Sequence, residues 1–232
     1  MKQIIFIIGS LRKKSFNRQL AKIAEEMLND RFEISYLNFE DIPYMNQDIE
    51  SLIVKVQQSL AGNIGSVSMS DKHFAENGEL EIGCYRSVDF IQQPISIYRS
   101  INSIRQQIQH CDGIWIFTPE YNRSYPGLLK NLFDWLSRPI DASNFANPTA
   151  VQGKKVTISG AGGKNKTISC REKLVELLEY IKMDVMKEPQ VGIELGMEAW
   201  VKGEFHLTEE QIAQLKKQAE MLGSLAYRTV RK

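Results

Sequence analysis

The feature that most constrains this fold is a pair of short, unbroken apolar runs. They are IIFII at residues 4–8 and GIWIF at residues 113–117. Strands that are apolar on both faces are typical of a parallel sheet covered by helices on both sides. The first run is too short for a signal peptide, and it ends at Gly9-Ser10 rather than at a cleavage site. We interpret both runs as buried parallel strands.

Segments of helical periodicity alternate with the predicted strands. Apolar residues at steps of three and four predict helices at residues 16–27, 97–108, 129–136, 174–181 and 212–226. Thr208 and Gln211 form a capping box for the last helix. Further strands are predicted at residues 32–39, 155–159 and 184–186. The alternation predicts an α/β fold: a three-layer sandwich with a five-stranded parallel sheet and helices on both faces.

Residues 50–93 break this alternation. The segment is rich in glycine, serine and asparagine and has weak periodicity. A connection of this length is a lid, an interface element or a mobile loop. A short strand at residues 79–85 is possible within it. We predict one domain spanning residues 1–232, with this segment as an insertion.

Composition excludes several classes of protein. The 29 Lys and Arg residues nearly balance the 28 Asp and Glu residues. This argues against a nucleic-acid-binding protein, which would be basic, and against a strongly acidic electron carrier. No run approaches the length of a membrane helix. Three widely spaced cysteines indicate no disulfide framework, so we predict a reducing, cytosolic location. The three histidines show no ligand spacing, and no metal site is predicted.

Ligands of an open parallel sheet bind at the carboxyl ends of its strands. GSLRKKSFN at residues 9–17 follows the first strand and opens the first helix. Its hydroxyls, its asparagine and Arg12, with the free amides of a helix start, suit a phosphate. Alternatively, Ser15 only caps the helix while Arg12 is solvated. The residues alone leave both interpretations open.

Two further segments follow strands three and four. In TPEYNRSYPG (residues 118–127), Glu120 is a possible general acid and Tyr121 a possible stacking group, and a plain turn is the alternative. In SGAGG (residues 159–163), the glycines permit close approach to a planar ligand, although a tight turn explains them equally well.

Together these segments resemble the NADPH-dependent FMN reductase family of flavodoxin-like proteins, which includes quinone, chromate and azo-dye reductases. The resemblance rests on GSLRKKSFN, on TPEYNRSYPGLLKNLFDWLSRP at residues 118–139, and on SGAGG. It implies an FMN site in which the first segment holds the phosphate and the other two border the isoalloxazine ring. The implied cofactor-binding residues are Gly9, Ser10, Arg12, Ser15, Phe16, Asn17, Pro119, Glu120, Tyr121, Asn122, Ser159, Gly160, Ala161, Gly162 and Gly163.

The resemblance also implies an activity. Hydride would pass from NADPH or NADH to FMN and then, in a ping-pong scheme, to a quinone, free flavin, azo compound or metal oxyanion. No residue is assigned as a catalytic acid or base, and Arg12 and Arg123 are candidates for contacting a 2′-phosphate. A homodimer or homotetramer is expected. The alternatives are a flavodoxin-type electron carrier and a flavin-binding regulator without its own turnover.

Two features depart from the family pattern. Arg123 stands where a neutral or aromatic residue is common, and residues 50–93 look like an insertion. Both could alter the substrate entrance or a subunit interface.

Overall fold

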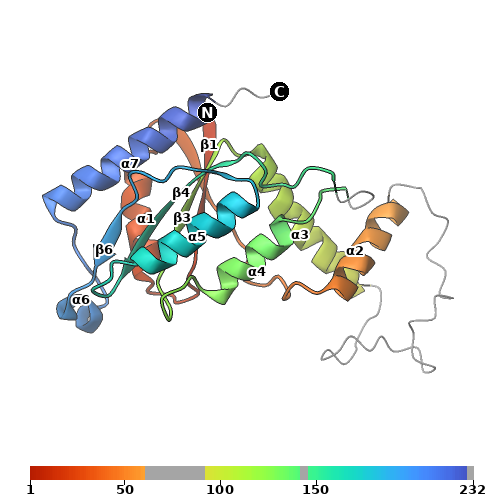
Figure 1. Cartoon of the computed structure of the whole chain (residues 1–232), viewed down its shortest axis with the longest axis horizontal. Coiled ribbons are helices and arrows are strands. Elements are labelled where there is room, and N and C mark those ends of the chain that lie inside the picture. Colours follow the sequence, from red (N-terminus) through yellow and green to blue (C-terminus); the bar gives the residue numbers. More distant parts are fainter. Residues whose placement is uncertain (61–91, 142–145, 229–232) are drawn as a thin grey trace. The chain divides into compact units, whose positions relative to one another are not determined.

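Each apolar run of the sequence forms a strand of one parallel sheet (Figure 1). The computed structural model describes residues 1–60, 92–141 and 146–228. The elements are, in order, β1 (Lys2–Ile8), α1 (Phe16–Glu26), β2 (Phe32–Tyr36), α2 (Gln47–Leu60), α3 (Gln92–His110), β3 (Gly113–Phe117), α4 (Gly127–Leu136), β4 (Lys155–Gly162), α5 (Ile168–Tyr180), β5 (Asp184–Val185), β6 (Gly192–Glu194), α6 (Met197–Lys202) and α7 (Glu209–Arg228).

The strand order is β2-β1-β3-β4-β5, and all neighbours are parallel. This confirms the predicted fold class. The edge strand is in two pieces, because β5 pairs with the start of β4 and β6 pairs with its end. That second pairing carries β4 through Gly162. The prediction that this strand ends at residue 159 was therefore wrong, since the strand continues for three more residues of the glycine-rich segment.

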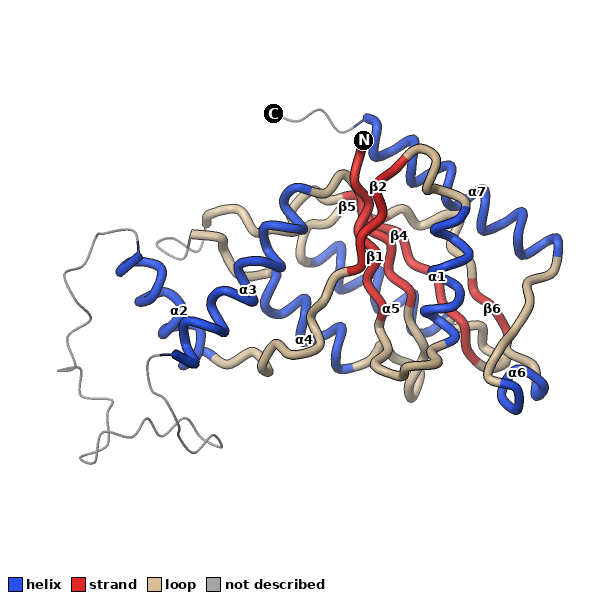
Figure 2. The backbone as a smooth tube through the Cα atoms, turned by 180° about the vertical axis from the view of Figure 1, so that it is seen from behind, coloured by secondary structure: helices blue, strands red, loops and turns tan. Residues whose placement is uncertain are grey.

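Helices cover both faces of the sheet. Alternate residues of a strand point to opposite faces. Ile4, Phe6 and Ile8 of β1, with Trp115 and Phe117 of β3, pack in one core with the apolar sides of α1 and α7. Figure 2 shows this face, and Figure 1 shows α4 and α5 across the other. Every residue of β3 is buried, as predicted for a strand covered on both sides.

A buried amide joins α7 to β4. Gln218 is fully buried, and its Oε1 accepts hydrogen bonds from Ser159 Oγ (2.8 Å) and Val191 N (2.9 Å). Its Nε2 donates to Thr157 Oγ1 (2.7 Å) and Ile158 O (2.9 Å). Trp115 Nε1 also donates to Ser159 Oγ, at 3.1 Å. The four hydrogen bonds of the Gln218 amide thus fix α7 on the sheet.

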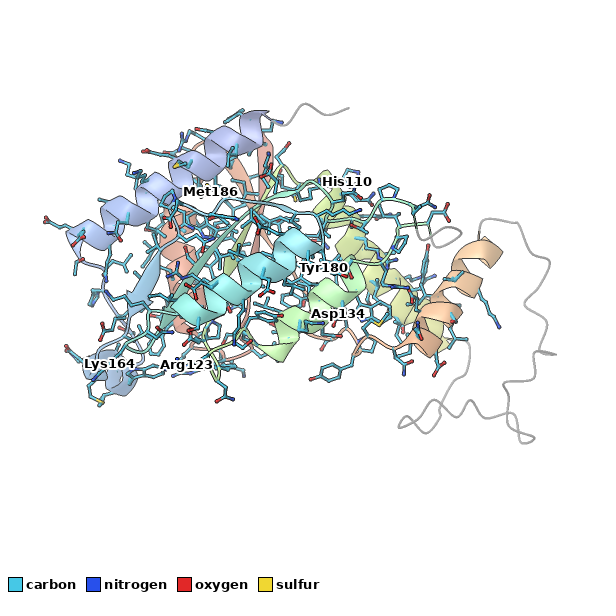
Figure 3. All side chains as sticks on the ribbon, viewed as in Figure 1. His110, Arg123, Asp134, Lys164, Tyr180 and Met186 are labelled. Atoms are coloured by element: carbon cyan, nitrogen blue, oxygen red, sulfur yellow. The ribbon has the colours of Figure 1, made fainter. Side chains whose placement is uncertain are left out.

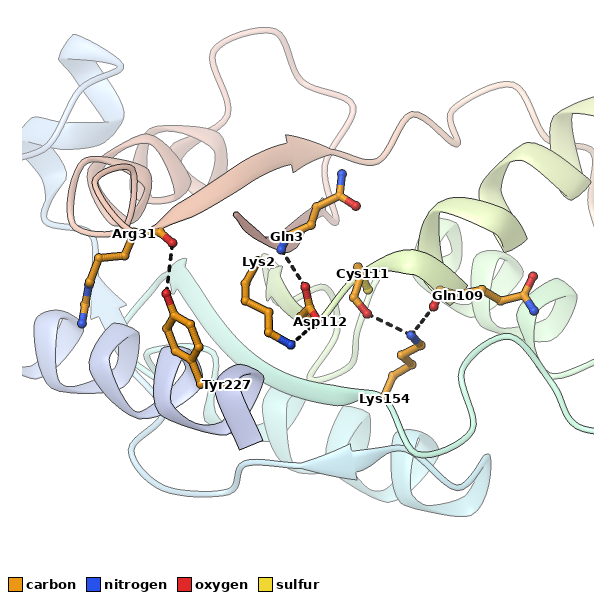
Figure 4. A network of polar contacts seen from close by, with 8 residues as sticks. All are labelled: Lys2, Gln3, Arg31, Gln109, Cys111, Asp112, Lys154 and Tyr227. Carbon is orange, nitrogen blue, oxygen red and sulfur yellow. Dashed lines mark hydrogen bonds and ion pairs between the residues drawn. The ribbon is translucent and has the colours of Figure 1, made fainter. Parts of the chain in front are cut away.

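Polar contacts close the end of the sheet where the strands begin (Figure 4). Asp112 accepts hydrogen bonds from Lys2 Nζ (2.9 Å) and Gln3 N (2.8 Å), which fixes β1 beside β3. Lys154, just before β4, donates to the carbonyls of Gln109 and Cys111. The opposite end, where the strands finish, carries the segments of functional interest.

Residues 41–104 form one unit of the chain, and residues 1–40 and 105–232 form the other. Within it α2 contains the buried Ile49 and Ile53, and α3 contains the buried Ile101 and Ile104. The interpretation of residues 50–60 as weakly periodic was wrong, because these residues belong to α2, where isoleucines four apart are buried. The predicted strand at residues 79–85 lies outside the described residues.

The start of α7 follows its sequence signal. Thr208 N donates to Gln211 Oε1 and Gln211 N donates to Thr208 Oγ1, which confirms the capping box of α7. Pro126 is the N-cap of α4. Among the helices that the structure describes, none is long and apolar enough to cross a membrane.

Candidate functional site

Three loops meet where β1, β3 and β4 end: the β1–α1 loop (residues 9–15), the β3–α4 loop (residues 118–126) and the β4–α5 loop (residues 163–167). Main-chain hydrogen bonds join their roots, since Gly9 N donates to Phe117 O (2.8 Å) and Thr118 N donates to Ser159 O (2.9 Å). The three segments predicted to act together are thus adjacent in space, as the carboxyl ends of neighbouring parallel strands must be.

The β1–α1 loop leaves hydrogen-bond donors free at the start of α1. Ser15 Oγ accepts a hydrogen bond from Arg18 N at 3.4 Å, so Ser15 does cap the helix. The main-chain N–H groups of residues 13–17 make no hydrogen bond to any residue described in the structure. Ser15, Phe16 and Asn17 are nevertheless buried. Buried N–H groups without partners are rare, and at a helix start they are suited to an anion.

Phe16 anchors this loop in an aromatic cluster. Its ring lies edge-on to Trp200 (5.2 Å between centroids) and to Phe205 (6.1 Å). The Arg12 guanidinium lies over the Phe16 ring, 5.1 Å from its centroid. Arg12 forms no ion pair with the described part of the chain. Its cation is therefore held over the first residue of α1 and remains available to a ligand.

Asn17 joins the β1–α1 loop to β4. Its Nδ2 donates to Ala161 O at 3.1 Å, and its Oδ1 accepts from Ala161 N at 2.8 Å. Both groups of the side-chain amide are thus bonded to main chain, and one N–H of Nδ2 remains for any other partner.

The β3–α4 loop turns in a two-residue hairpin. Tyr121 and Ser124 pair in an antiparallel bridge, and between them Asn122 and Arg123 have φ of +50° and +58°. This is a type I′ turn, which favours Asn first and Gly second. Tyr121 is 55% exposed. Figure 3 shows Arg123 and Lys164 at the same end of the sheet, with His110 at the opposite end.

The Glu120 carboxylate bonds to α5 rather than facing an open site. It accepts hydrogen bonds from Asn165 Nδ2 (2.8 and 3.1 Å) and from Cys170 N (2.9 Å). Sequence reasoning missed Asn165 and Cys170, since nothing local marks residues 45 and 50 positions away as partners. Burial raises the pKa of the Cys170 thiol to about 11, so this thiol is protonated at neutral pH.

Most of the glycine-rich segment packs against the protein itself. Ser159 is fully buried, with its hydroxyl in the Gln218 network. A Cβ on Gly160 would overlap Thr167 Oγ1 and Thr118 O, and a Cβ on Gly162 would lie 2.9 Å from Thr167 Cγ2. A Cβ on Gly163 would have no atom within 4 Å. Close approach by a ligand is therefore open at Gly163, while Gly160 and Gly162 are required by internal packing.

The three loops carry six cations and one carboxylate, that of Glu120. None of the six forms an ion pair with a described residue. They are Arg12, Lys13, Lys14, Arg123, Lys164 and Lys166. This charge suits phosphate-bearing ligands. Across the described ranges, no group of three or more His, Cys, Asp or Glu side chains could hold a metal ion.

Comparison with known proteins places the chain in a flavin enzyme family. The model of the NADPH-dependent FMN reductase family matches residues 2–65 and 73–198. A 2-hydroxy-1,4-benzoquinone reductase from Burkholderia sp is 28% identical over 192 residues, covering 82% of this chain and 78% of that protein. A quinone reductase of Escherichia coli K12 is 26% identical over 189 residues, covering 81% and 75%.

Solved structures support the fold. FerB, a flavoenzyme NAD(P)H:(acceptor) oxidoreductase from Paracoccus denitrificans, has a TM-score of 0.68 at 22% identity, and 98% of each chain is covered. An archaeal flavodoxin has a TM-score of 0.51 at 10% identity, covering 98% of this chain and 100% of the other.

Proposed function

Since the chain belongs to the NADPH-dependent FMN reductase family, we propose that it binds FMN at the three loops and uses NADPH or NADH to reduce a quinone. When bound, the flavin supplies the redox chemistry, taking hydride from the nicotinamide and passing electrons to the acceptor in a ping-pong scheme. The protein binds and orients the ring and the two substrates, and no side chain is assigned as acid or base.

The observation that carries this proposal is the group of unpartnered N–H groups at residues 13–17 beside Arg12. A phosphate placed there would satisfy the N–H groups of the buried residues 15–17, which otherwise lack partners, and it would face the positive end of α1. Ser10 lies in the same loop and is buried, with its Oγ 3.4 Å from Arg12 N. These residues fit the phosphate of FMN.

The other two loops are suited to the ring. Tyr121 offers a half-exposed aromatic face, and the space beside Gly163 is open, since no atom lies within 4 Å of the position that a Cβ would take there. Pro119 and Asn122 lie on the same loop as Tyr121. We propose that residues 119–122 border one side of the isoalloxazine and that the end of β4, at residues 161–163, borders its other edge.

The quinone is the proposed acceptor because the two relatives described above are named as quinone reductases. Cations near the ring, Arg123 and Lys164 among them, would favour NADPH over NADH by attracting the 2′-phosphate. We further propose a homodimer or homotetramer. Leu11 and Trp200, which are 58% and 50% exposed beside the site, give such an assembly an apolar surface to bury.

An anaerobic visible spectrum of the FMN-loaded protein, taken before and after NADPH is added, tests the proposal. We expect the flavin bands to bleach within seconds and to return when a quinone is added. Bound FMN that stays oxidised with both NADPH and NADH would instead favour an electron carrier or a flavin-binding regulator. A protein that binds no FMN would contradict the site itself.

A further inference from the structure

The start of α5 lacks a cap of its own. Its N-cap residue, Thr167, has φ of +58°, and its side chain makes no capping hydrogen bond. Thr167 Oγ1 is buried without a hydrogen-bond partner among the described residues. Glu120, from a loop on another strand, accepts the hydrogen bond of Cys170 N, the third residue of the helix. Its negative charge also lies at the positive end of the helix, which stabilises both partners.

Glu120 is one part of a larger link between two loops. Asn165 Nδ2 donates to both oxygens of the Glu120 carboxylate and to Ser169 Oγ at 3.0 Å. Directly before Glu120, Pro119 O accepts hydrogen bonds from Thr118 Oγ1 (2.9 Å) and from Cys170 Sγ (3.4 Å). We call Glu120, Asn165 and Cys170 the loop latch. It joins the root of residues 119–122 to the loop that begins at Gly163.

We propose that Glu120 is a positioning residue for the flavin ring, acting through Asn165 and the start of α5. This rests on the proposed function, in which residues 119–122 and Gly163 border opposite edges of that ring. Because the latch joins these two borders, it sets the width of the space between them. A site on two loops needs such support to hold its geometry.

The latch can be broken from either side. Glu120→Ala removes the acceptor from the β3–α4 loop, and Asn165→Ala removes the donor from the β4–α5 loop. Asn165 is exposed and is not among the residues proposed to touch FMN, so its variant is expected to fold. Glu120→Gln keeps an oxygen that can accept from Cys170 N. Glu172→Ala removes an exposed carboxylate from α5 and is the matched control.

The test measures FMN affinity, the positions of the flavin absorption bands and steady-state kinetics for the full chain and these variants. Glu120→Ala and Asn165→Ala should each weaken FMN binding about tenfold and shift the bands. The double variant should be no weaker than Glu120→Ala, because both changes break one link. Glu120→Gln should recover most of the affinity, and Glu172→Ala should match the parent protein.

Three results would overturn the proposal. Multiplied losses in the double variant would mean that the two residues act independently. A loss with Glu120→Ala but none with Asn165→Ala would assign Glu120 to direct contact with the flavin. If the variants unfolded more easily but kept the FMN affinity and the flavin absorption bands of the parent protein, the latch would serve only the stability of the fold. A parent protein without FMN affinity would instead overturn the proposed function and this inference with it.

Discussion

The side-chain amide of Asn17 forms two hydrogen bonds with the main chain of Ala161, the same pair of bonds that two facing strand residues exchange. The Asn17 amide both donates to and accepts from Ala161, and both residues are buried. The helix start that follows the β1–α1 loop is therefore fixed to the end of β4. As the Asn17 side chain is used in this way, Arg12 and the unpartnered N–H groups carry most of the proposed phosphate binding.

Replacing Arg12 by alanine should weaken FMN binding. The change removes a charge-assisted contact to the phosphate, of about 1.5–3 kcal/mol, so the dissociation constant should rise about tenfold to a hundredfold. Fluorescence titration of FMN measures it. Lys13→Ala, which removes an exposed cation from the next position, is the control and should have a much smaller effect. If both changes weakened FMN binding equally, Arg12 would contribute only a long-range attraction to the phosphate rather than a direct contact.

Two glycines of the same segment should respond differently to alanine. Gly160→Ala places a methyl group against Thr167 and the main chain of Thr118, and should lower the free energy of unfolding by about 1–3 kcal/mol. Gly163→Ala meets no atom within 4 Å and should change it by less than about 0.5 kcal/mol. Urea denaturation of the apoprotein measures both. A stable Gly160→Ala variant would contradict the packing described for β4.

Gln218→Leu should destabilise the protein strongly at nearly constant side-chain volume. Ser159 Oγ and Val191 N lose their acceptor, and Thr157 and Ile158 lose a donor, all in the core. We expect a loss of about 3 kcal/mol or more in urea denaturation. Gln214→Leu, one turn earlier on the exposed side of α7, should have little effect. Similar results for both positions would show that the buried network contributes no net stability.

Arg123→Gly should stabilise the protein. Arg123 has a positive φ at the second central position of a type I′ turn, where a Cβ is unfavourable. Relief of that strain should raise the free energy of unfolding by about 0.5–1 kcal/mol. Arg123→Ala removes the same charge but keeps the Cβ, and it should give no such gain. A gain of equal size with alanine would point to charge repulsion instead.

Folding stability should fall at alkaline pH because of two buried thiols. Burial raises the pKa of Cys111 and of Cys170 from 9.0 to about 11. Between these two pKa values the thiols of the unfolded chain ionise while those of the folded protein stay protonated. The contribution of the two thiols to folding stability is therefore complete below pH 9 and is lost as pH rises toward 11. Urea denaturation at about pH 8 and about pH 10 measures this fall.

The variant Cys111→Ala, Cys170→Ala is the comparison for the alkaline titration. Its stability should fall less steeply, and a fall equal to that of the parent protein would exclude the thiols as the cause. The stability of this variant should still fall with pH at more alkaline values, because burial and a hydrogen bond to Glu25 raise the pKa of Tyr36 as well.

The sequence predicts the elements whose burial follows a period. The β1 and β3 runs, and the stripes of α1, α4 and α7, require only alternation or steps of three and four. It does not predict β6 and α6, which are short; β6 is defined by its pairing with Gly160–Gly162. The candidate site is likewise predictable only in part. The adjacency of the three segments follows from the parallel topology of the sheet. The hydrogen bond from Cys170 N to Glu120 does not, because it depends on where α5 is placed.

The Gln218 network also has a consequence for the newly made chain. Helix α7 is the last of the described elements to leave the ribosome. Until it docks, Thr157, Ser159 and Val191 lack their partner, and the face of the sheet containing Phe6 and Trp115 is only partly covered. A nascent chain that holds every strand would still expose apolar surface to chaperones and to aggregation. We therefore expect docking of α7 to be the step that buries this surface and completes the hydrogen bonds of β4.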